Sequence, residues 1–575
     1  MAGEGFDARP RNGVSYVVGD TSVPLAHVTV SALLADTVRR CPDAEAVVFR
    51  EQNVRWTWRA FAEQVDALAA GLHALGLERG DRIGIWSPNR YEWVLTQFAT
   101  ARLGLILVNI NPAYRLSELE YALNKVGCKA IVAAEAFKSS RYLEMLQTLA
   151  PELATAQPGA LNAAKLPALR WVIRMGEAAT PGMINFADVV ARGKGDNGSV
   201  PVDALDAITN TLSPDDAINI QFTSGTTGAP KGATLTHVNV VNNARFVAMA
   251  MNLQAGDRLC IPVPLYHCFG MVMSVLTCTA TGACMVFPGE AFDPLATLRT
   301  VAEERCTQLH GVPTMFIAQL DHPDFKTFDV SSLRGGIMAG SPCPIEVMKR
   351  VVSELNLREV TIAYGMTETS PVSFQSAVTD PLDKRVTTVG RIQPHLQVKL
   401  ADGAGETVPV GEKGELCTKG YSVMLGYWDD EAKTAESIQD GWMRTGDLAT
   451  FDAEGYCNIV GRVKDMLIRG GENVYPREIE EFLFRHPKVQ AVNVFGVPDP
   501  KYGEEVCAWI VLKPGQQATE EEIRTFCQGQ IAHYKIPRYI RFVTEMPMTV
   551  TGKVQKFVMR DRMIEELKLT VAATA

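Results

Sequence analysis

The sequence lacks the cysteine pairs and histidine patterns that mark zinc-binding or disulfide-rich proteins. Its 12 cysteines are scattered over 575 residues, with no Cys-x-x-Cys pair. This argues against a structural zinc site and favours a reducing compartment. Residues 1–16 also lack the apolar stretch of a secretory signal. We therefore expect a cytoplasmic protein.

Basic charge is not in excess, and unbroken apolar runs are scarce. The 56 Lys and Arg residues are outnumbered by 65 Asp and Glu residues, which gives a net charge of −9. Nothing in that balance predicts a nucleic-acid partner or an anionic membrane surface. Residues 259–288 carry no charged side chain and are long enough to span a bilayer, but prolines and glycines interrupt them. A buried strand, loop and helix is favoured there over a transmembrane segment.

Length and periodicity predict an α/β enzyme with more than one lobe. A chain of 575 residues is too long for one hydrophobic core, and 47% hydrophobic with 21% charged residues is typical of a soluble globular enzyme. Between residues 29 and 210, apolar residues at helical spacing alternate with short apolar runs at 82–86, 106–110 and 130–133. This alternation predicts α/β layering around a largely parallel sheet.

Capping patterns predict where several helices begin. Ser117 with Glu120, and Thr519 with Glu522, have the spacing of a capping box. Asn239 is the expected cap of a helix that runs to residue 251, and Pro476 is expected to open another helix.

One glycine-rich stretch, residues 223–232, has the composition of a phosphate-binding loop. It reads Thr-Ser-Gly-Thr-Thr-Gly-Ala-Pro-Lys-Gly and lies between two short apolar runs. Its glycines let the backbone approach an anion, its hydroxyl groups are donors, and Lys231 adds a positive charge. A flexible linker is the alternative interpretation. Pro230 and Gly232 flank the lysine where a Walker A loop needs Gly and Ser or Thr, so a P-loop kinase or ATPase is disfavoured.

The decapeptide resembles the signature of the adenylate-forming superfamily, which includes acyl-CoA synthetases, luciferases and the adenylation domains of peptide synthetases. Further stretches match that family in the same order: residues 364–368, 442–447, 461–465 with Gly470 and Gly471, and 547–553. The resemblance implies a large, multi-lobed N-terminal α/β domain with mostly parallel sheets over residues 1–463. It also implies a small, mobile C-terminal α+β domain over residues 464–575, with Lys464 as the hinge.

The activity that the resemblance implies is that of an AMP-forming acid–thiol ligase that uses ATP with Mg²⁺ and takes coenzyme A as co-substrate. The enzyme would convert a carboxylic acid to an acyl adenylate, release pyrophosphate, and transfer the acyl group to coenzyme A. Residues 338–342 and 363–371 are most similar to medium-chain fatty acyl-CoA synthetases, including the group called acyl-CoA synthetase family member 2. No aspartate follows His267 within Cys268-Phe-Gly, which favours an acid without an α-amine.

Alternatives stay open at this point. The ligase could hand its acyl adenylate to a carrier protein, or it could take an aromatic, branched or sulfur-containing acid. A non-catalytic ATP-binding protein is a rival from a different class, although it would have little need for Gly552 and Lys553. Assembly as a homodimer is also open.

The resemblance further implies a role for each motif residue. Taken singly, each has an ordinary interpretation as a core histidine, a solvated charge or an exposed turn. In the family pattern, Lys553, Lys231, Glu368 and His267 are expected to be catalytic, and Glu368 with Thr223 to hold the metal. The residues expected to bind the nucleotide or coenzyme A are Thr223, Ser224, Gly225, Thr226, Thr227, Gly228, Lys231, Gly340, Ser341, Pro342, Tyr364, Gly365, Thr367, Asp447, Arg462, Lys464, Gly470 and Gly471.

Overall fold

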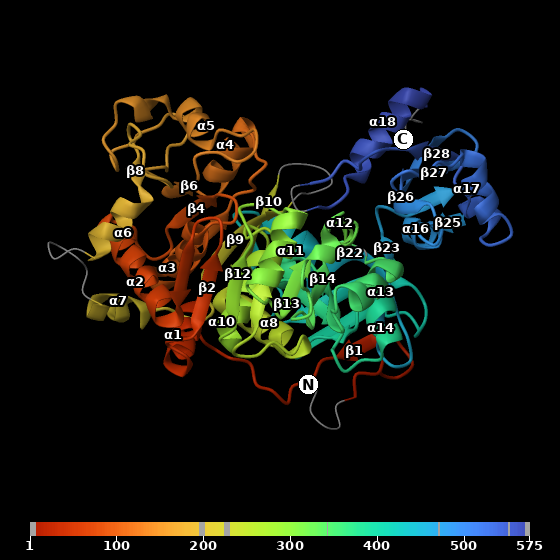
Figure 1. Ribbon diagram of the computed structural model, residues 1–575, viewed down its shortest axis with the longest axis horizontal. Helices are drawn as coiled ribbons and strands as arrows, with labels where there is room; N and C mark the ends of the chain where they lie inside the picture. The colour runs from red at the N-terminus through yellow and green to blue at the C-terminus, as the bar shows by residue number, and fades with distance from the viewer. Residues whose placement is uncertain are drawn as a thin grey trace.

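The computed structural model describes residues 7–194, 202–223, 230–341, 343–469, 472–549 and 552–569. In Figure 1 the first large sheet lies at the left, the second in the middle, and a small C-terminal unit at the upper right. The predicted α/β class and the division into a large and a small unit are confirmed. Residues 259–288 form short elements and loops, and no helix in the described ranges is long and apolar enough to cross a membrane.

The first sheet has the strand order β20-β10-β9-β5-β4-β6-β7-β8. Its strands are parallel from β9 to β8, whereas β10 runs antiparallel to both β9 and β20. The strands are β4 (Arg82–Trp86), β5 (Ile106–Asn109), β6 (Ala130–Ala133), β7 (Trp171–Arg174), β8 (Ile184–Asn185), β9 (Ala217–Thr223), β10 (Lys231–Thr236) and β20 (Gly426–Tyr427). The helices that lie before or between these strands in the sequence are α2 (Trp58–Ala74), α3 (Tyr91–Leu103), α4 (Leu116–Lys125), α5 (Tyr142–Leu149), α6 (Phe186–Lys194) and α7 (Val202–Thr209).

The second sheet has the order β17-β16-β15-β14-β13-β11-β12-β2-β3, with parallel pairing in its centre and antiparallel pairing at both edges. Its strands are β2 (Glu45–Phe49), β3 (Val54–Thr57), β11 (Arg258–Cys260), β12 (Cys284–Phe287), β13 (Gln308–Gly311), β14 (Gly335–Ala339), β15 (Glu359–Gly365), β16 (Val372–Gln375) and β17 (Arg391–Ile392). Its helices are α1 (Val30–Arg40), α8 (His237–Ala250), α9 (Cys268–Gly270), α10 (Thr277–Thr281), α11 (Pro294–Glu303), α12 (Pro313–Leu320), α13 (Ile345–Glu354) and α14 (Leu382–Thr387), and residues Met271–Leu276 form a π-helix.

A third, antiparallel sheet completes the large unit. It contains β1 (Tyr16–Val18), β18 (Leu396–Ala401), β19 (Gly414–Gly420), β21 (Ile438–Gln439), β22 (Trp442–Phe451) and β23 (Cys457–Arg462), with α15 (Glu431–Ser437) beside it. Strand β1 pairs with β18, so a segment near the N-terminus closes one edge of this sheet. In Figure 1 the chain runs from β1 beneath the middle lobe to α1 at the left.

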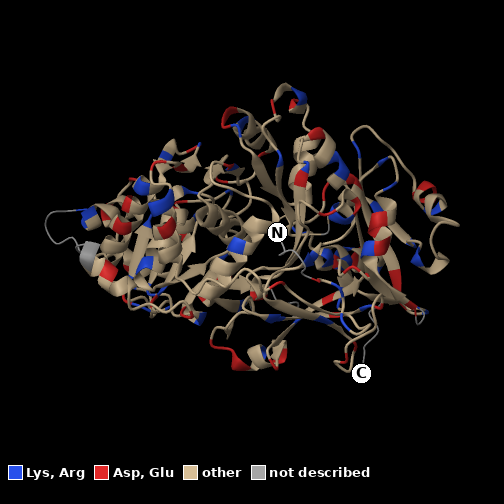
Figure 2. Cartoon of the chain, turned by 90° about the horizontal axis from the view of Figure 1, so that it is seen from below, with Lys and Arg blue, Asp and Glu red and all other residues tan. Residues whose placement is uncertain are grey.

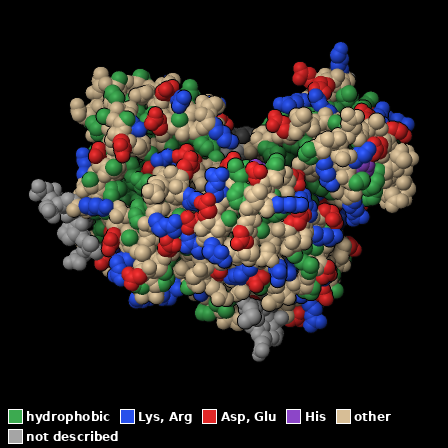
Figure 3. All heavy atoms as spheres, in the orientation of Figure 1, with side chains coloured by type: hydrophobic (Ala, Val, Ile, Leu, Met, Phe, Trp, Pro, Cys, Tyr) green, Lys and Arg blue, Asp and Glu red, His purple; other side chains and the backbone are tan. Residues whose placement is uncertain are grey.

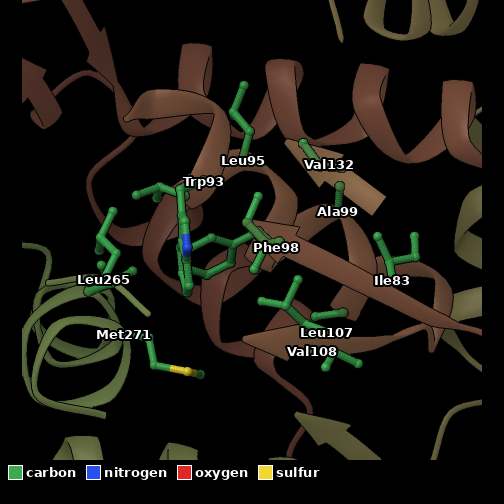
Figure 4. Close-up of a cluster of buried hydrophobic side chains, with 14 of the residues drawn as sticks. Ile83, Trp93, Leu95, Phe98, Ala99, Leu107, Val108, Val132, Leu265 and Met271 are labelled. Atoms are coloured by element: carbon green, nitrogen blue, oxygen red, sulfur yellow. The ribbon is translucent and has the colours of Figure 1, made fainter. Parts of the chain in front are cut away.

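The small unit has its own sheet and its own core. The strands are β24 (Leu467–Arg469), β25 (Glu472–Val474), β26 (Val489–Asp499), β27 (Gly503–Leu512) and β28 (Tyr539–Phe542), and the helices are α16 (Pro476–Leu483), α17 (Glu520–Cys527) and α18 (Lys556–Leu567). Its buried apolar residues, such as Val494, Ile510 and Ile523, form clusters apart from those of the large unit. In the large unit, Trp93 and Phe98 of α3 pack with Leu265 and Met271 from the segment after β11 (Figure 4).

Two of the predicted helix starts are wrong. Helix α4 begins at Leu116, so its cap is Arg115 and not Ser117. The Glu118 carboxylate accepts a hydrogen bond from the Arg115 amide at 2.9 Å. Helix α8 is capped by Thr236, whose Oγ1 accepts from the amide of Asn239 at 3.1 Å. The predictions at Thr519 and Pro476 are confirmed.

Candidate active site

The glycine-rich loop begins and ends on paired strands. Strands β9 and β10 form an antiparallel pair in which Thr223 lies opposite Lys231. This register fixes both ends of the loop at one edge of the first sheet, where the phenol of Tyr121 donates to the Pro230 carbonyl at 3.1 Å. The predicted site residues Ser224, Gly225, Thr226, Thr227 and Gly228 lie outside the described residues.

Glu368 joins this hairpin from the second sheet. It lies just after β15 and is only 5% exposed. Its Oε1 accepts a hydrogen bond from Thr223 Oγ1 at 3.0 Å and another from the phenol of Tyr427 at 2.9 Å. The same phenol accepts from Lys231 Nζ at 3.0 Å. Sequence reasoning predicted Thr223, Lys231 and Glu368 but missed Tyr427, whose place beside them depends on the pairing of β20 with β10.

The carboxylate and hydroxyl oxygens at Glu368 and Thr223 are suited to a magnesium ion that the phosphates of the nucleotide also bind. Mg²⁺ prefers hard oxygen ligands and is usually bound through one or two carboxylates plus substrate phosphates. Here Oε1 already accepts two hydroxyl groups, whereas Oε2 accepts no hydrogen bond from the described residues. Among the described residues, no group of three or more His, Cys, Asp or Glu is arranged so that it could hold a metal ion by itself.

Asp447 connects the third sheet to the end of β15. Its Oδ2 accepts a hydrogen bond from the phenol of Tyr364 at 2.7 Å, and its Oδ1 accepts from Arg462 Nε at 3.0 Å. Asp447 and Arg462 are direct partners in the β22–β23 pair, so the register sets this contact. Burial, together with the Asp447 charge, raises the pKa of the Tyr364 phenol well above its usual value, which keeps this donor protonated.

His267 is held as a neutral imidazole. It caps the short helix α9, and its Nδ1 accepts a hydrogen bond from the amide of Phe269 at 3.2 Å. Burial, assisted by the positive charge of Lys553, lowers the pKa of His267 to about 3. Because Nδ1 accepts, the proton of the neutral ring is assigned to Nε2, which is then available as a donor.

Lys553 comes from the small unit and lies close enough to His267 for its charge to affect the pKa of that histidine. The turn before it is closed by a hydrogen bond from the Gly552 amide to the Thr549 carbonyl at 2.9 Å. A Cβ placed on Gly552 would lie 3.1 Å from Val312 Cγ2 and 3.3 Å from Thr314 Oγ1, so this turn lies against the start of α12 in the large unit. Figure 3 shows an open notch, which we call the cleft, between the small unit and the part of the large unit that holds the first sheet.

The surroundings of Lys553 show which groups share this cleft. Burial and the charge of Arg462 lower the pKa of Lys553, while Asp447 and Glu368 act in the opposite direction. The side chain is nevertheless exposed. The two observations agree, because an open cleft admits solvent although its protein walls displace much of the water around the amine.

The remaining predicted residues lie around this group. Gly340 ends β14 with φ of +89°, and a Cβ there would lie 3.1 Å from Val312 Cγ1, so this loop meets the same valine as Gly552. Gly365 is tightly enclosed, since a Cβ would lie 1.7 Å from the Pro371 carbonyl oxygen. Ser341 follows Gly340, Thr367 is buried beside Glu368, and Lys464 lies in the turn after β23. Pro342, Gly470 and Gly471 lie outside the described residues.

Known proteins are similar to this chain in both sequence and architecture. The family described as AMP-binding enzyme matches residues 34–428, and the AMP-binding enzyme C-terminal domain matches residues 478–553. A medium-chain acyl-CoA ligase, ACSF2, of Danio rerio is 50% identical over 97% of this chain and 92% of its own length. The putative acyl-CoA synthetase YngI of Bacillus subtilis is 47% identical over 95% and 99%.

Solved structures give the same result. The anthranilate CoA ligase AuaEII in complex with anthranoyl-AMP has a TM-score of 0.84 at 27% identity, over 96% of this chain and 99% of its own. ATP-bound MatB from Rhodopseudomonas palustris has a TM-score of 0.80 at 28% identity, over 94% and 99%. The chain therefore belongs to the AMP-binding enzyme family and is an AMP-forming acid–CoA ligase.

Proposed function

We propose that this ligase activates a medium-chain fatty acid and that the residues gathered in the cleft carry both half-reactions. The observation that supports this most directly is the convergence of Lys553, from the small unit, with Glu368, Asp447 and His267 of the large unit. Relatives that are named medium-chain acyl-CoA ligases support the substrate class. The absence of a carboxylate in Cys268–Gly270 beside His267 supports an acid without an α-amine.

The first half-reaction gives the acid a better leaving group than oxide, because the acyl adenylate that it forms can later release AMP. A carboxylate oxygen of the acid attacks the α-phosphate of ATP, the bond to the bridging oxygen breaks, and pyrophosphate leaves. Lys231 and Lys553 would stabilise the negative charge that develops on the phosphates. His267 Nε2–H would donate to the acid carboxylate and hold it in line. Asp447 would accept the ribose hydroxyl groups, with Arg462 beside it, and Tyr364 would lie against the base.

Mg²⁺ would be held by Glu368, with Thr223 beside it, and when bound it neutralises charge on the phosphate oxygens. The chain's own part is to keep the Glu368 carboxylate buried and directed by two hydroxyl donors.

The second half-reaction needs a different entrance to the cleft. We place the boundary between the two domains at residues 463 and 464, because the small unit's clusters of buried apolar residues start at Leu467. Among the described residues, polar contacts that cross this boundary include Arg477 Nη1 to the Ile459 carbonyl at 2.6 Å and Gln490 Nε2 to Asp321 Oδ2 at 3.2 Å. A cavity of about 220 Å³ separates α13 from α16. Such an interface suits a small domain that rotates about Lys464 and brings Gly470 and Gly471 towards the pantetheine thiol.

Location and assembly remain predictions. All twelve cysteines are unpaired, which supports the cytoplasmic prediction, whereas several relatives are named mitochondrial. Fractionation of the source cells tests the first prediction. Light scattering of the purified enzyme tests the homodimer.

The proposed function is tested with a panel of acids in which AMP and acyl-CoA are measured together. Linear acids of medium length should give both products, and each further buried methylene should contribute up to about 0.8 kcal/mol. Labelled pyrophosphate should exchange into ATP without coenzyme A but only when the acid is present. Acid-dependent ADP, or a preference for an amino acid, would overturn the proposal. If the enzyme formed acid-dependent AMP but no acyl-CoA, the acyl group would have to pass to an acceptor other than coenzyme A.

A further inference from the structure

We infer that Tyr427 is a positioning residue, an uncharged spacer that keeps Lys231 and Glu368 from forming an ion pair and so leaves both available to MgATP. The inference rests on the proposed roles of Lys231 and Glu368 and adds a residue to them. It concerns the state of the site before the nucleotide binds.

The hydrogen bonds around the Tyr427 phenol run in one direction. An ammonium group has donors and no acceptor, so the phenol oxygen accepts from Lys231 Nζ, at 3.0 Å. The phenolic proton is then free to point at Glu368 Oε1, 2.9 Å away. Lys231 Nζ also lies 4.2 Å from the centre of the Tyr427 ring, in cation–π contact. One side chain therefore contacts both charged groups without carrying charge.

Lys231 and Glu368 are near neighbours but are not an ion pair. No contact within 4.0 Å joins their charged atoms in this structure, although each is bonded to the same phenol oxygen. A pair of opposite charges this close in a partly buried site would attract each other strongly. The phenol oxygen lies within hydrogen-bond distance of both groups, at 3.0 Å from Lys231 Nζ and 2.9 Å from Glu368 Oε1.

The backbone of Tyr427 is fixed independently of the charged groups. Strand β20 pairs with β10 so that Tyr427 lies opposite Ala233, which places it diagonally across from Lys231. The Tyr427 amide donates to Thr434 Oγ1 at 2.9 Å, and the next amide, of Trp428, donates to the Gly232 carbonyl at 2.7 Å. The side chain is only 5% exposed. The spacer therefore cannot swing away to let the two charges meet.

The test is Tyr427→Phe, which keeps the ring and its contact with Lys231 but removes the hydroxyl. Without it, Lys231 should move onto Glu368, and MgATP would have to break that pair. We expect the KM for MgATP in pyrophosphate exchange to rise tenfold or more, with kcat within about threefold of wild type. Acyl adenylate has no γ-phosphate for Lys231 or the Glu368-bound metal to contact. Thioester formation from supplied acyl adenylate should therefore stay near the wild-type rate.

Direct binding gives a readout that does not depend on turnover. Calorimetry should show weaker ATP binding by the variant in EDTA, because the paired lysine is less available. The gain in ATP affinity on adding Mg²⁺ should also shrink, because Glu368 is engaged. In a Lys231→Gln background, Tyr427→Phe should have little further effect on ATP affinity, since no ammonium remains to pair with Glu368.

Tyr456→Phe is a matched control. Its phenol also donates to a carboxylate, Asp380 Oδ1, at 2.9 Å, and Lys384 and Arg391 lie over its ring. Tyr456 directly precedes β23, whereas Arg462 is the last residue of that strand. The Tyr456→Phe variant should therefore keep wild-type ATP affinity. If Tyr427→Phe does not fold, Tyr427→Met removes the same hydroxyl with a flexible side chain and carries the same expectation.

The outcomes separate the inference from the function on which it rests. If the wild-type enzyme forms no acid-dependent AMP, the proposed function fails. If it does, and Tyr427→Phe binds ATP like wild type both in EDTA and in Mg²⁺, the spacer role is wrong. An equal loss in both half-reactions would also overturn it, since that result indicates a general structural role.

Discussion

Lys553→Ala offers the sharpest test of the cleft, because this lysine comes from the small unit and acts beside groups of the large one. Its ammonium lies in the electrostatic field of Arg462, Asp447 and Glu368. The turn that carries it is pressed against Val312. The substitution removes the charge and leaves that turn unchanged, so the loss measures the charge itself.

The size of the effect follows from what one preorganised group contributes. Removing a single such electrostatic contact from an active site costs about 2.7–4 kcal/mol, or roughly 10² to 10³ in rate. Lys553 lies close enough to Arg462, Asp447 and Glu368 for their charges to affect its pKa, so we assign it to this class. We expect acid-dependent pyrophosphate exchange to fall by roughly 10² to 10³, and thioester formation from supplied acyl adenylate to fall much less.

The pH dependence gives a second signature. Burial, followed by the charge of Arg462, lowers the pKa of Lys553 below its usual value of 10.5. The protonated form is the active one, so exchange should be complete below the lowered pKa and decline as pH rises through it. The alkaline decline of the wild type should therefore lie below pH 10.5. In Lys553→Arg the guanidinium stays charged, and this decline should disappear even if the rate is low.

The assay compares the two half-reactions on one enzyme preparation, with Lys513→Ala as the control. Lys513 is an exposed lysine of the small unit whose Nζ donates to the Pro487 carbonyl, and its removal should leave both rates unchanged. Equal losses of exchange and thioester formation in Lys553→Ala would refute the reasoning. So would an alkaline decline that survives in Lys553→Arg.

Three further predictions concern the hinge, the catalytic turn and stability. Proline removes an N–H and fixes φ near −65°, so Lys464→Pro should restrict rotation of the small domain. Because Lys553 already lies in the cleft, pyrophosphate exchange should survive, whereas thioester formation should drop at least tenfold. Gly552→Ala should slow exchange, measured against the thioester step, because φ of +78° is strained for alanine and its Cβ would press on Val312. Thr519→Ala loses the hydrogen bond from the Glu522 amide, and urea unfolding should show about 1 kcal/mol less stability with unchanged exchange; an intact stability would mean that the cap is redundant.

Local patterns predicted several elements of this fold. The apolar runs at 82–86 and 130–133 coincide with β4 and β6, and Pro476 opens α16 as expected. Helix starts were less certain, because Ser, Thr, Asn and Glu near a helix end compete for the same free amides. At α8 both Thr236 and Asn239 take part, and only the folded backbone shows that Thr236 is the cap.

The sequence by itself determined which residues could bind phosphate, a metal or an acid, because their chemistry and their order along the chain are local properties. Tertiary structure decided which of them meet. Thr223 and Glu368 are 145 positions apart, and the hydrogen bond between them depends on how two separate sheets pack. Tyr427 carries no motif of its own and reaches Lys231 through the pairing of β20 with β10. Contacts of this kind arise from strand register and from packing between distant segments, which neither residue type nor spacing encodes.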